Sequence, residues 1–238
     1  MNTDTETSVP NIAEYNPYSR FLLAVDCIIF GFDGKRLKAL FIKRAFNPGI
    51  NKWSLMGGFV QANEGVENAA SRILLQLTGL GNIYMEQLHC FGTVNRDPGG
   101  RVISIAYFAL INIEDYSEEM MKEHNAKWFE LNHIPALIFD HNEMVLLAKE
   151  RLQQKIANHP VGFALLPQKF TLRQLQTLYE AINETELDKR NFTRRILDLG
   201  ILKKLDEKER GTSKKGSFYF VFDEEKYKKL DKEGIKLV

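Results

Sequence analysis

Residues 58–80 contain the side chains whose spacing bears most directly on chemistry. Glu64 and Glu67 lie within one turn of each other, and carboxylate oxygens are the ligands that a hard cation such as Mg²⁺ prefers. Apolar residues between positions 66 and 77 recur at intervals of three and four, which predicts a helix over residues 65–78. A weak metal site made of Glu64 and Glu67 is one alternative that this pattern leaves open.

The spacing of this segment resembles the Nudix box, which runs glycine, five residues, glutamate, seven residues, then Arg-Glu-aliphatic-x-Glu-Glu-x-Gly-aliphatic. The residues in register are Gly58, Glu64, Arg72, Leu74, Gly79 and Leu80. In the family, the glutamates of this helix hold a divalent metal that clamps a pyrophosphate and activates water. Here the three positions that share one helix face hold Ile73, Gln76 and Leu77. We therefore expect no bound metal, no hydrolase activity, and a pocket that binds a ligand without cleaving it.

The elements around this box predict an α+β protein with two parts. In the first part, predicted strands at residues 21–30, 37–43, 88–95 and 102–111 accompany helices at 65–78 and 142–157, which predicts a Nudix fold: a mixed sheet with packed helices. In the second part, helices at 172–182 and 188–199 precede strands at 202–206 and 217–222, the order of a winged helix-turn-helix.

The predicted organisation is an N-terminal arm (1–17), a Nudix-like effector-binding domain (18–158) and a winged helix DNA-binding domain (159–238). The first ten residues are polar and acidic, unlike a secretory signal. No stretch approaches the roughly 20 apolar residues that a membrane span needs. We therefore expect a cytoplasmic protein with no membrane partner.

The net charge of +1 conceals a basic segment. Residues 189–215 contain ten basic and four acidic residues, a composition that suits a polyanion such as DNA; an ordinary solvated surface is the alternative. On the helix at 188–199, Phe192, Ile196, Leu197 and Leu199 can face inward. The predicted DNA-binding residues are Arg190, Asn191, Thr193, Arg194 and Arg195 of the helix, and Lys203, Lys204, Lys208, Arg210, Lys214 and Lys215 of the hairpin. Arg and Asn can read base edges, and lysines can meet phosphates.

Residues 166–172 and 187–195 resemble the DNA-binding domain of Nudix-related transcriptional regulators. This resemblance implies a Nudix domain that senses a metabolite and a homodimer that binds double-stranded operator DNA. The chain looks most like the pentose-responsive branch. This likeness to the pentose-responsive branch implies a repressor of L-arabinose or pentose utilisation genes that a sugar effector releases from the operator. The alternatives are an ADP-ribose-sensing regulator of NAD synthesis, an active Nudix hydrolase of nucleoside diphosphate derivatives, and a protein-interaction scaffold.

Asp26 is the sharpest candidate for effector binding, because a carboxylate in an apolar strand needs a reason. Its alternative role is a buried partner for an arginine or a backbone turn. The other predicted effector-binding residues are Lys43, Phe59, Glu64, Asn95, Arg96 and Tyr107. We expect Trp53 in the core, the helix at 142–157 as a candidate link between the domains, and Cys27 and Cys90 as reduced core thiols. The scattered histidines suggest no structural metal, and we expect no cofactor.

Overall fold

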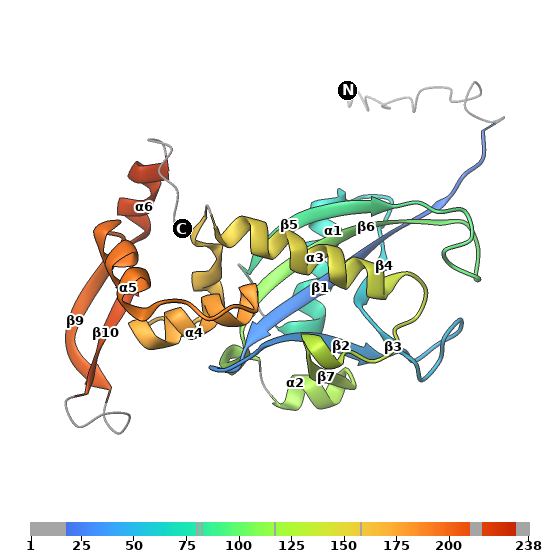
Figure 1. The fold of residues 1–238 in the computed structure, drawn as a ribbon. Helices are drawn as coiled ribbons and strands as arrows, with labels where there is room; N and C mark the ends of the chain where they lie inside the picture. Colours follow the sequence, from blue (N-terminus) through green and yellow to red (C-terminus); the bar gives the residue numbers. More distant parts are fainter. Residues whose placement is uncertain are drawn as a thin grey trace, which may run out of the picture.

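The structure is a computed structural model that describes residues 18–79, 81, 83–116, 118–157, 159–209 and 216–231. A larger N-terminal domain and a smaller C-terminal domain pack against each other (Figure 1). The predictions made for residues 1–17, Leu80, Arg210, Lys214 and Lys215 lie outside the described residues.

Seven strands build the N-terminal sheet. They are β1 (Leu22–Phe32), β2 (Leu37–Lys43), β3 (Trp53–Ser54), β4 (Met56–Phe59), β5 (Tyr84–Phe91), β6 (Val102–Asn112) and β7 (Ala126–Glu130). The main order is β3-β2-β1-β6-β5, while β4 also pairs with β1 and β7 with β2. The central strands β1 and β6 run parallel, and the other pairs are antiparallel. The predicted mixed sheet is therefore confirmed.

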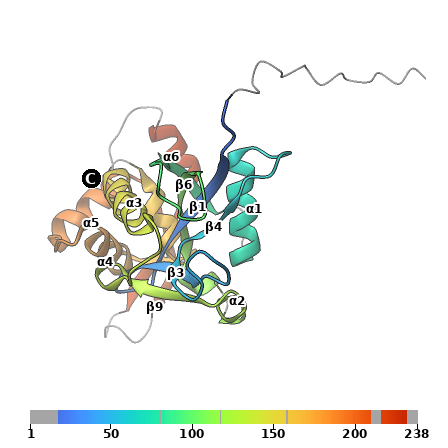
Figure 2. The ribbon, with the colours of Figure 1, turned by 90° about the vertical axis from the view of Figure 1, so that its right-hand side faces the viewer.

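The two faces of this sheet are covered by different helices (Figure 2). Side chains alternate between the faces of a strand. Val25, Cys27 and Ile29 pack in the cluster that includes α1 (Val66–Thr78). Ile28 and Phe30 pack in the cluster that includes α3 (His141–Ile156). Asp26 has the register of this second set, so it lies on the α3 face.

The C-terminal domain is a winged helix, as predicted. It comprises the 3₁₀ helix η4 (Pro160–Leu165), β8 (Phe170–Thr171), α4 (Leu172–Asn183), α5 (Lys189–Asp198), β9 (Leu202–Glu209), β10 (Ser217–Phe222) and α6 (Glu224–Asp231), with sheet order β8-β10-β9. Thr171 and Gln174 form a reciprocal capping box at the start of α4. The carboxylate of Asp188 caps α5 by accepting from the backbone N–H of Asn191. These two caps fix where the helices of the helix-turn-helix begin.

The two domains share one hydrophobic core. A single cluster contains Met144 and Leu152 of α3, Leu178 of α4, and Phe192 and Ile196 of α5. In Figure 1, α4 lies between the Nudix sheet and the rest of the winged helix. The predicted domain limits stay a prediction, because the packing gives no sharp boundary.

Several sequence predictions need correction. Strand β5 lies four residues earlier than predicted, because the chain turns after it, with the N–H of Arg96 donating to the carbonyl of Thr93 at 3.3 Å. Cys27 is buried but Cys90, on the edge strand β5, is exposed. Leu197 is exposed although it was expected to face inward. The elements not predicted are β3, β4, η2 (Ile113–Asp115), α2 (Glu118–Glu123), η3 (Leu131–His133), η4, β8 and α6.

Two features are absent from the segments that the structure describes. No helix there is both long and apolar enough to cross a membrane. No group of three or more His, Cys, Asp or Glu side chains in these segments could hold a metal ion.

Candidate effector site and nucleic-acid interface

A buried cluster of charged side chains lies on the α3 face of the Nudix sheet. The guanidinium of Arg96 donates from Nε and Nη2 to the carboxylate of Asp140, at 2.8 and 2.6 Å. The same Nη2 lies 3.6 Å from Oδ2 of Asp26, which also accepts a 2.6 Å hydrogen bond from the hydroxyl of Ser104. Asp26 and Arg96 are each 8% exposed. Asp26 therefore has the buried arginine partner that was its alternative role, and its part in effector binding stays a prediction.

Each member of the cluster is placed by a local feature of the chain. Asp140 is the N-cap residue of α3, yet its side chain does not cap that helix and binds Arg96 instead. Gly57 pairs with Asp26 across β4 and β1. A Cβ at Gly57 would lie 2.2 Å from Oδ1 of Asp26 and 2.8 Å from the carbonyl oxygen of Val25. Glycine at this position therefore makes room for the buried carboxylate.

His141 is a neutral member of the cluster. Its Nδ1 accepts a 3.1 Å hydrogen bond from the backbone N–H of Leu55, so the ring proton is on Nε2. Nε2 lies 3.8 Å from Oδ1 of Asp26. Burial lowers the pKa of His141, and the charges of Asp26 and Asp140 oppose this shift only in part.

A cleft of 540 Å³ opens beside the cluster. Its lining residues are Pro48, Gly49, Lys52, Trp53, Pro98, Ala136, Leu137, Ile138 and Phe139. Phe139 has a φ of 52°, which is unusual for a residue with a Cβ and is found most often at functional sites. The volume lies within the range typical of small-molecule sites. We therefore regard this cleft, with the buried cluster beside it, as the candidate effector site.

Arg44 extends the site toward solvent. Its guanidinium lies 3.9 Å above the ring of Phe46 and 5.6 Å from that of Phe139. Burial lowers its pKa, while the charges of Asp97 and Asp26 raise it. Its Nε is buried and has no hydrogen-bond partner among the residues that the structure describes. A buried donor without a partner is rare in native proteins and is available to a ligand oxygen.

The structure brings some of the predicted effector-binding residues to this site. Asp26 and Arg96 are in the cluster, and Asn95 is exposed in the turn next to Arg96. Lys43 places its ammonium 5.4 Å from the ring of Trp53, which lines the cleft and is only partly buried. Phe59 pairs with Ala24, two residues before Asp26, so it shares the α3 face and is half exposed.

Two of the predicted effector-binding residues lie elsewhere. Tyr107 packs on the α1 face, and its hydroxyl lies 3.4 Å from Oε1 of Gln87. Glu64 is held by Arg72, whose Nε and Nη2 donate to its two oxygens at 2.9 and 2.5 Å, and by the N–H of Gln61 at 2.9 Å. The hydrogen bonds from Arg72 lower the pKa of Glu64 to about 2. Both carboxylate oxygens of Glu64 therefore organise the box loop.

The helix of the Nudix box presents an apolar surface to the sheet. Ile73 is buried, Leu77 is partly buried in the same cluster, and Gln76 is exposed. A Cβ at Gly58 would lie 3.0 Å from the Ile73 side chain, so the glycine loop packs directly on this residue. Glu67, the other carboxylate near the box, is exposed. The side chains at this surface do not fit a divalent cation, which requires several converging oxygens.

The exposed face of α5 is the candidate nucleic-acid interface. Arg190, Asn191, Arg194 and Arg195 are exposed there, opposite the buried Phe192 and Ile196. Nη2 of Arg194 donates to Oδ1 of Asn191 at 3.2 Å, so these two side chains are already aligned. Thr193 is only half exposed, at the border of this face.

The described strand β9 of the wing carries balanced charge. Lys203, Lys204 and Lys208 are exposed on β9, as predicted, but the same strand carries Asp206, Glu207 and Glu209. The ammonium groups of Lys204 and Lys208 lie 3.6 and 4.4 Å from the ring centre of Phe218. Within the described part of this domain, the unbalanced positive charge is therefore concentrated on α5.

Several residues of the effector site were not found by sequence reasoning. Arg44, Ser104 and the adjacent pair Asp140 and His141 come from three separate segments, and the predicted helix at 142–157 started just after that pair. The signal that could have found them is the Asp-His pair at a helix start, a position where Asp normally caps.

Comparisons with known proteins assign both domains. Residues 20–149 match the family profile of the NUDIX domain, and residues 162–222 match that of the NrtR DNA-binding winged helix domain. The crystal structure of Shewanella oneidensis NrtR complexed with a 27mer DNA has a TM-score of 0.78 at 27% identity, covering 87% of this chain and 95% of that one. The chain belongs to the Nudix-related transcriptional regulators, a class of DNA-binding proteins.

Two curated relatives concern the ligand. The ADPR responsive transcriptional repressor NtrR of Acinetobacter baylyi is 34% identical over 202 residues, which is 82% of this chain and 81% of that protein. The ADP-ribose pyrophosphatase of Methanocaldococcus jannaschii is 37% identical over 136 residues, 57% of this chain and 77% of that protein. The names of both relatives refer to ADP-ribose. The predicted arabinose or pentose branch is therefore not supported, because it rested on overall similarity alone, and the ADP-ribose alternative fits better.

Proposed function

We propose that this protein is an ADP-ribose-responsive transcriptional repressor whose Nudix domain binds ADP-ribose without hydrolysing it. The observation that carries the proposal is the apolar surface of the box helix. Ile73, Gln76 and Leu77 supply no carboxylate for the metal ion that pyrophosphate cleavage uses. The repressor of A. baylyi, similar over 82% of this chain, supports the choice of effector.

The lining of the candidate effector site supports a nucleotide over a free sugar. Trp53 and Phe139 offer aromatic surface on which a purine can stack. Lys52 and the stacked guanidinium of Arg44 offer positive charge for phosphate oxygens. L-arabinose has neither an aromatic ring nor a charge, so it would leave these groups unused.

The output of the protein would be binding of operator DNA through α5. The exposed arginines and Asn191 have the donors and acceptors that read base edges in the major groove. A homodimer would place two such helices on two half-sites. ADP-ribose would act by favouring a conformation that binds DNA weakly, and only its difference in affinity between the two conformations can shift the population.

The DNA-binding assignment is tested with a labelled duplex that the protein selects from a random pool. Replacing both Arg194 and Arg195 by alanine is expected to weaken binding by at least about 30-fold, because each bidentate contact to a base is worth roughly 1–3 kcal/mol. Lys122→Ala, an exposed lysine of α2, is the control and should bind normally. Normal binding by the double variant would show that α5 is not the interface.

The effector assignment is tested by calorimetric titration with ADP-ribose and with L-arabinose. ADP-ribose is expected to bind and arabinose is not. Arg44→Ala should weaken ADP-ribose binding by at least about tenfold, since a hydrogen bond to a charged group is worth roughly 1.5–3 kcal/mol. The exposed Arg20→Ala serves as the matched control. Binding of arabinose and not ADP-ribose would overturn the assignment.

A second candidate function is hydrolysis of ADP-ribose, which the similarity to the M. jannaschii pyrophosphatase favours. Incubation with Mg²⁺ and ADP-ribose, followed by chromatography of the nucleotides, separates the two. Our proposal predicts that ADP-ribose is recovered intact. Formation of AMP that is lost in Glu64→Gln would support the hydrolase.

A further inference from the structure

Helix α3 connects the candidate effector site to the winged helix. Its N-cap residue Asp140 is bound by Arg96, and its first residue His141 is bound by the N–H of Leu55. Lys149 and Gln153, further along the same helix, contact α4. A helix rises 1.5 Å per residue, so about 20 Å separates Asp140 from Gln153 along α3.

The contacts with α4 fall at the end of that helix. Nε2 of Gln153 donates to the carbonyl oxygen of Ile182 at 2.8 Å. Ile182 is among the last four residues of α4, whose carbonyls have no partner within the helix. Nζ of Lys149 lies 2.8 Å from Oε1 of Glu184, the residue that ends α4 in a left-handed conformation with φ of 53°. Side chains of the Nudix domain therefore complete the C-terminus of the first DNA-binding helix.

From the end of α4, hydrogen bonds continue to α5. The N–H of Leu187 donates to Oε1 of Glu180 at 3.0 Å, and Nε2 of Gln176 donates to the carbonyl of Leu187 at 3.0 Å. Both backbone groups of Leu187 are thus held by α4, and the next residue, Asp188, caps α5. A displacement of the end of α4 would therefore move the start of the exposed basic helix.

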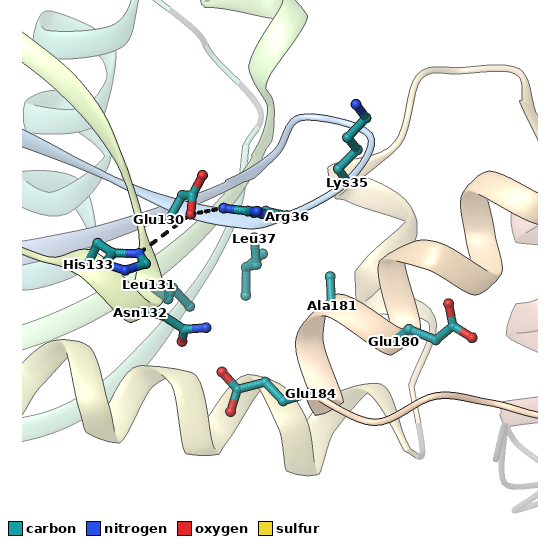
Figure 3. A pocket seen from close by; sticks show the side chains of 10 residues that line it. All are labelled: Lys35, Arg36, Leu37, Glu130, Leu131, Asn132, His133, Glu180, Ala181 and Glu184. Atoms are coloured by element: carbon teal, nitrogen blue, oxygen red, sulfur yellow. Dashed lines mark hydrogen bonds and ion pairs between the residues drawn. The ribbon is translucent and has the colours of Figure 1, made fainter.

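The end of α4 lies between the packed helix α3 on one side and an open cleft on another. The inner face of α3 is fully packed, with Met144, Ala148 and Leu152 completely buried, so the helix transmits movement as a rigid body. On another side, Ala181 and Glu184 border a cleft of 420 Å³ whose opposite wall includes Arg36, Glu130 and His133 (Figure 3). The cleft leaves this side of the end of α4 open, while Ile182 on the same turn is completely buried in the core that the two domains share.

We propose that Lys149 and Gln153 are positioning residues that couple the effector site to the DNA-binding helix. This inference rests on the proposed function. A ligand that changes the contact between Arg96 and Asp140 moves the start of α3, and the contacts of Lys149 and Gln153 carry that movement to α4 and α5. The coupling is measured as the ratio of the DNA dissociation constants with and without saturating ADP-ribose.

The first experiment compares that ratio in four proteins. Lys149→Ala combined with Gln153→Ala should bind ADP-ribose and, without effector, DNA within about threefold of the unmodified protein, because a partly exposed ion pair and one part-buried hydrogen bond contribute little. Its coupling ratio should fall toward one, from a value expected within the usual 5–150-fold. Lys149→Arg should retain the ratio, because arginine can still pair with Glu184, and Lys122→Ala should also retain it. An unchanged ratio in the double variant would overturn the inference.

The second experiment tests the coupling without any effector, so it is decisive even if ADP-ribose is not the ligand. Asp140→Asn keeps acceptor oxygen for Arg96 but removes the charge. It should speed hydrogen exchange of the backbone amides of Thr185 and Leu187, which lie beyond α4, by about threefold or more. Adding Gln153→Ala and Lys149→Ala should make this effect disappear, so that the combined variant exchanges no faster than the double variant alone. No effect of Asp140→Asn, or additive effects, would overturn the coupling. Failure of ADP-ribose to bind would overturn only the proposed function.

Discussion

The two faces of the Nudix sheet carry opposite kinds of side chains. On the α1 face, the positions where the Nudix family has metal-binding glutamates hold Ile73, Gln76 and Leu77, and the remaining Glu64 is occupied by Arg72. On the α3 face, Asp26, Arg96 and Asp140 form a buried charged cluster beside a cleft. Buried charges are costly unless they are paired. The difference is what we expect of a domain that binds its ligand without cleaving it, as we propose.

The largest expected effect separates the two arginines, one on each face. Arg96→Met should cost roughly 3–5 kcal/mol in the free energy of unfolding, because it leaves two buried carboxylates without their cation. Arg72→Met should cost clearly less, because its side chain is 27% exposed and water can replace it at Glu64. Urea unfolding of both variants measures the difference. Equal losses in the free energy of unfolding would mean that the buried cluster of Arg96 contributes no more to stability than the pair of Arg72 and Glu64.

A smaller effect is expected from Gly57→Ala. The added Cβ would meet Oδ1 of Asp26 at 2.2 Å and the backbone of Val25 at 2.8 Å. The cluster must then shift, at a cost of roughly 1–3 kcal/mol, the usual range for overpacking. Gly92→Ala is the control, because a Cβ there meets nothing within 4 Å. Thermal unfolding of the two variants should show a lower Tm for Gly57→Ala only. A matching loss in the control would point to backbone strain at the replaced glycine and not to the cluster.

Restoring carboxylates to the α1 face should alter metal binding without disturbing the α3 face. Gln76 is exposed and Leu77 half buried, so replacing both by glutamate is the gentlest restoration. The double variant should bind Mn²⁺ at least about tenfold more tightly than the unmodified protein, since converging carboxylates favour hard cations. Leu75→Glu, at an exposed position of the same helix, should not. Calorimetric titration measures both. Tight Mn²⁺ binding by the unmodified protein would contradict our description of the box.

The smallest expected effects are losses of stability in two separate pH ranges. His141 has a folded pKa below its ordinary 6.5, so the unfolded chain binds more protons and stability should fall as the pH drops below about 6.5. Glu64 has a pKa of about 2 against an ordinary 4.5, so its contribution is present above pH 4.5 and is lost between about 4.5 and 2. Urea midpoints measured across this pH range should show that His141→Asn lacks only the pH dependence below about 6.5, and that Glu64→Gln lacks only the pH dependence between about 4.5 and 2. If Glu64→Gln also lacked the pH dependence near 6.5, the assignment of that range to His141 would be wrong.

The sequence predicted the elements better than it predicted the effector site. Helical spacing located α4 and α5, and the box spacing located α1. Tyr107 was misplaced because both faces of a central strand are buried, so an apolar pattern does not reveal which face a residue occupies. The register does reveal it, since Tyr107 pairs with Cys27 on the α1 side.

The buried cluster could not be assembled from the sequence for a related reason. Asp26, Arg96 and Asp140 are far apart along the chain and meet only because β1, the loop before β6 and the start of α3 converge. Arg44 lies outside any helical or strand pattern in the sequence, so no pattern marked it as a residue of the site. The choice of effector was also beyond the sequence pattern, because overall similarity to one regulatory branch identifies no residue that contacts the ligand.

Release of DNA by ADP-ribose, followed over time in the presence of Mg²⁺, tests binding without cleavage in a single trace. A labelled duplex bound to the protein is mixed with a modest excess of ADP-ribose, and its fluorescence anisotropy is recorded for hours. We predict an immediate fall in anisotropy that then stays constant, with at least about a fivefold weakening of DNA binding. No fall, or a fall that reverses as the nucleotide is consumed, would contradict the proposal that this protein senses ADP-ribose without destroying it.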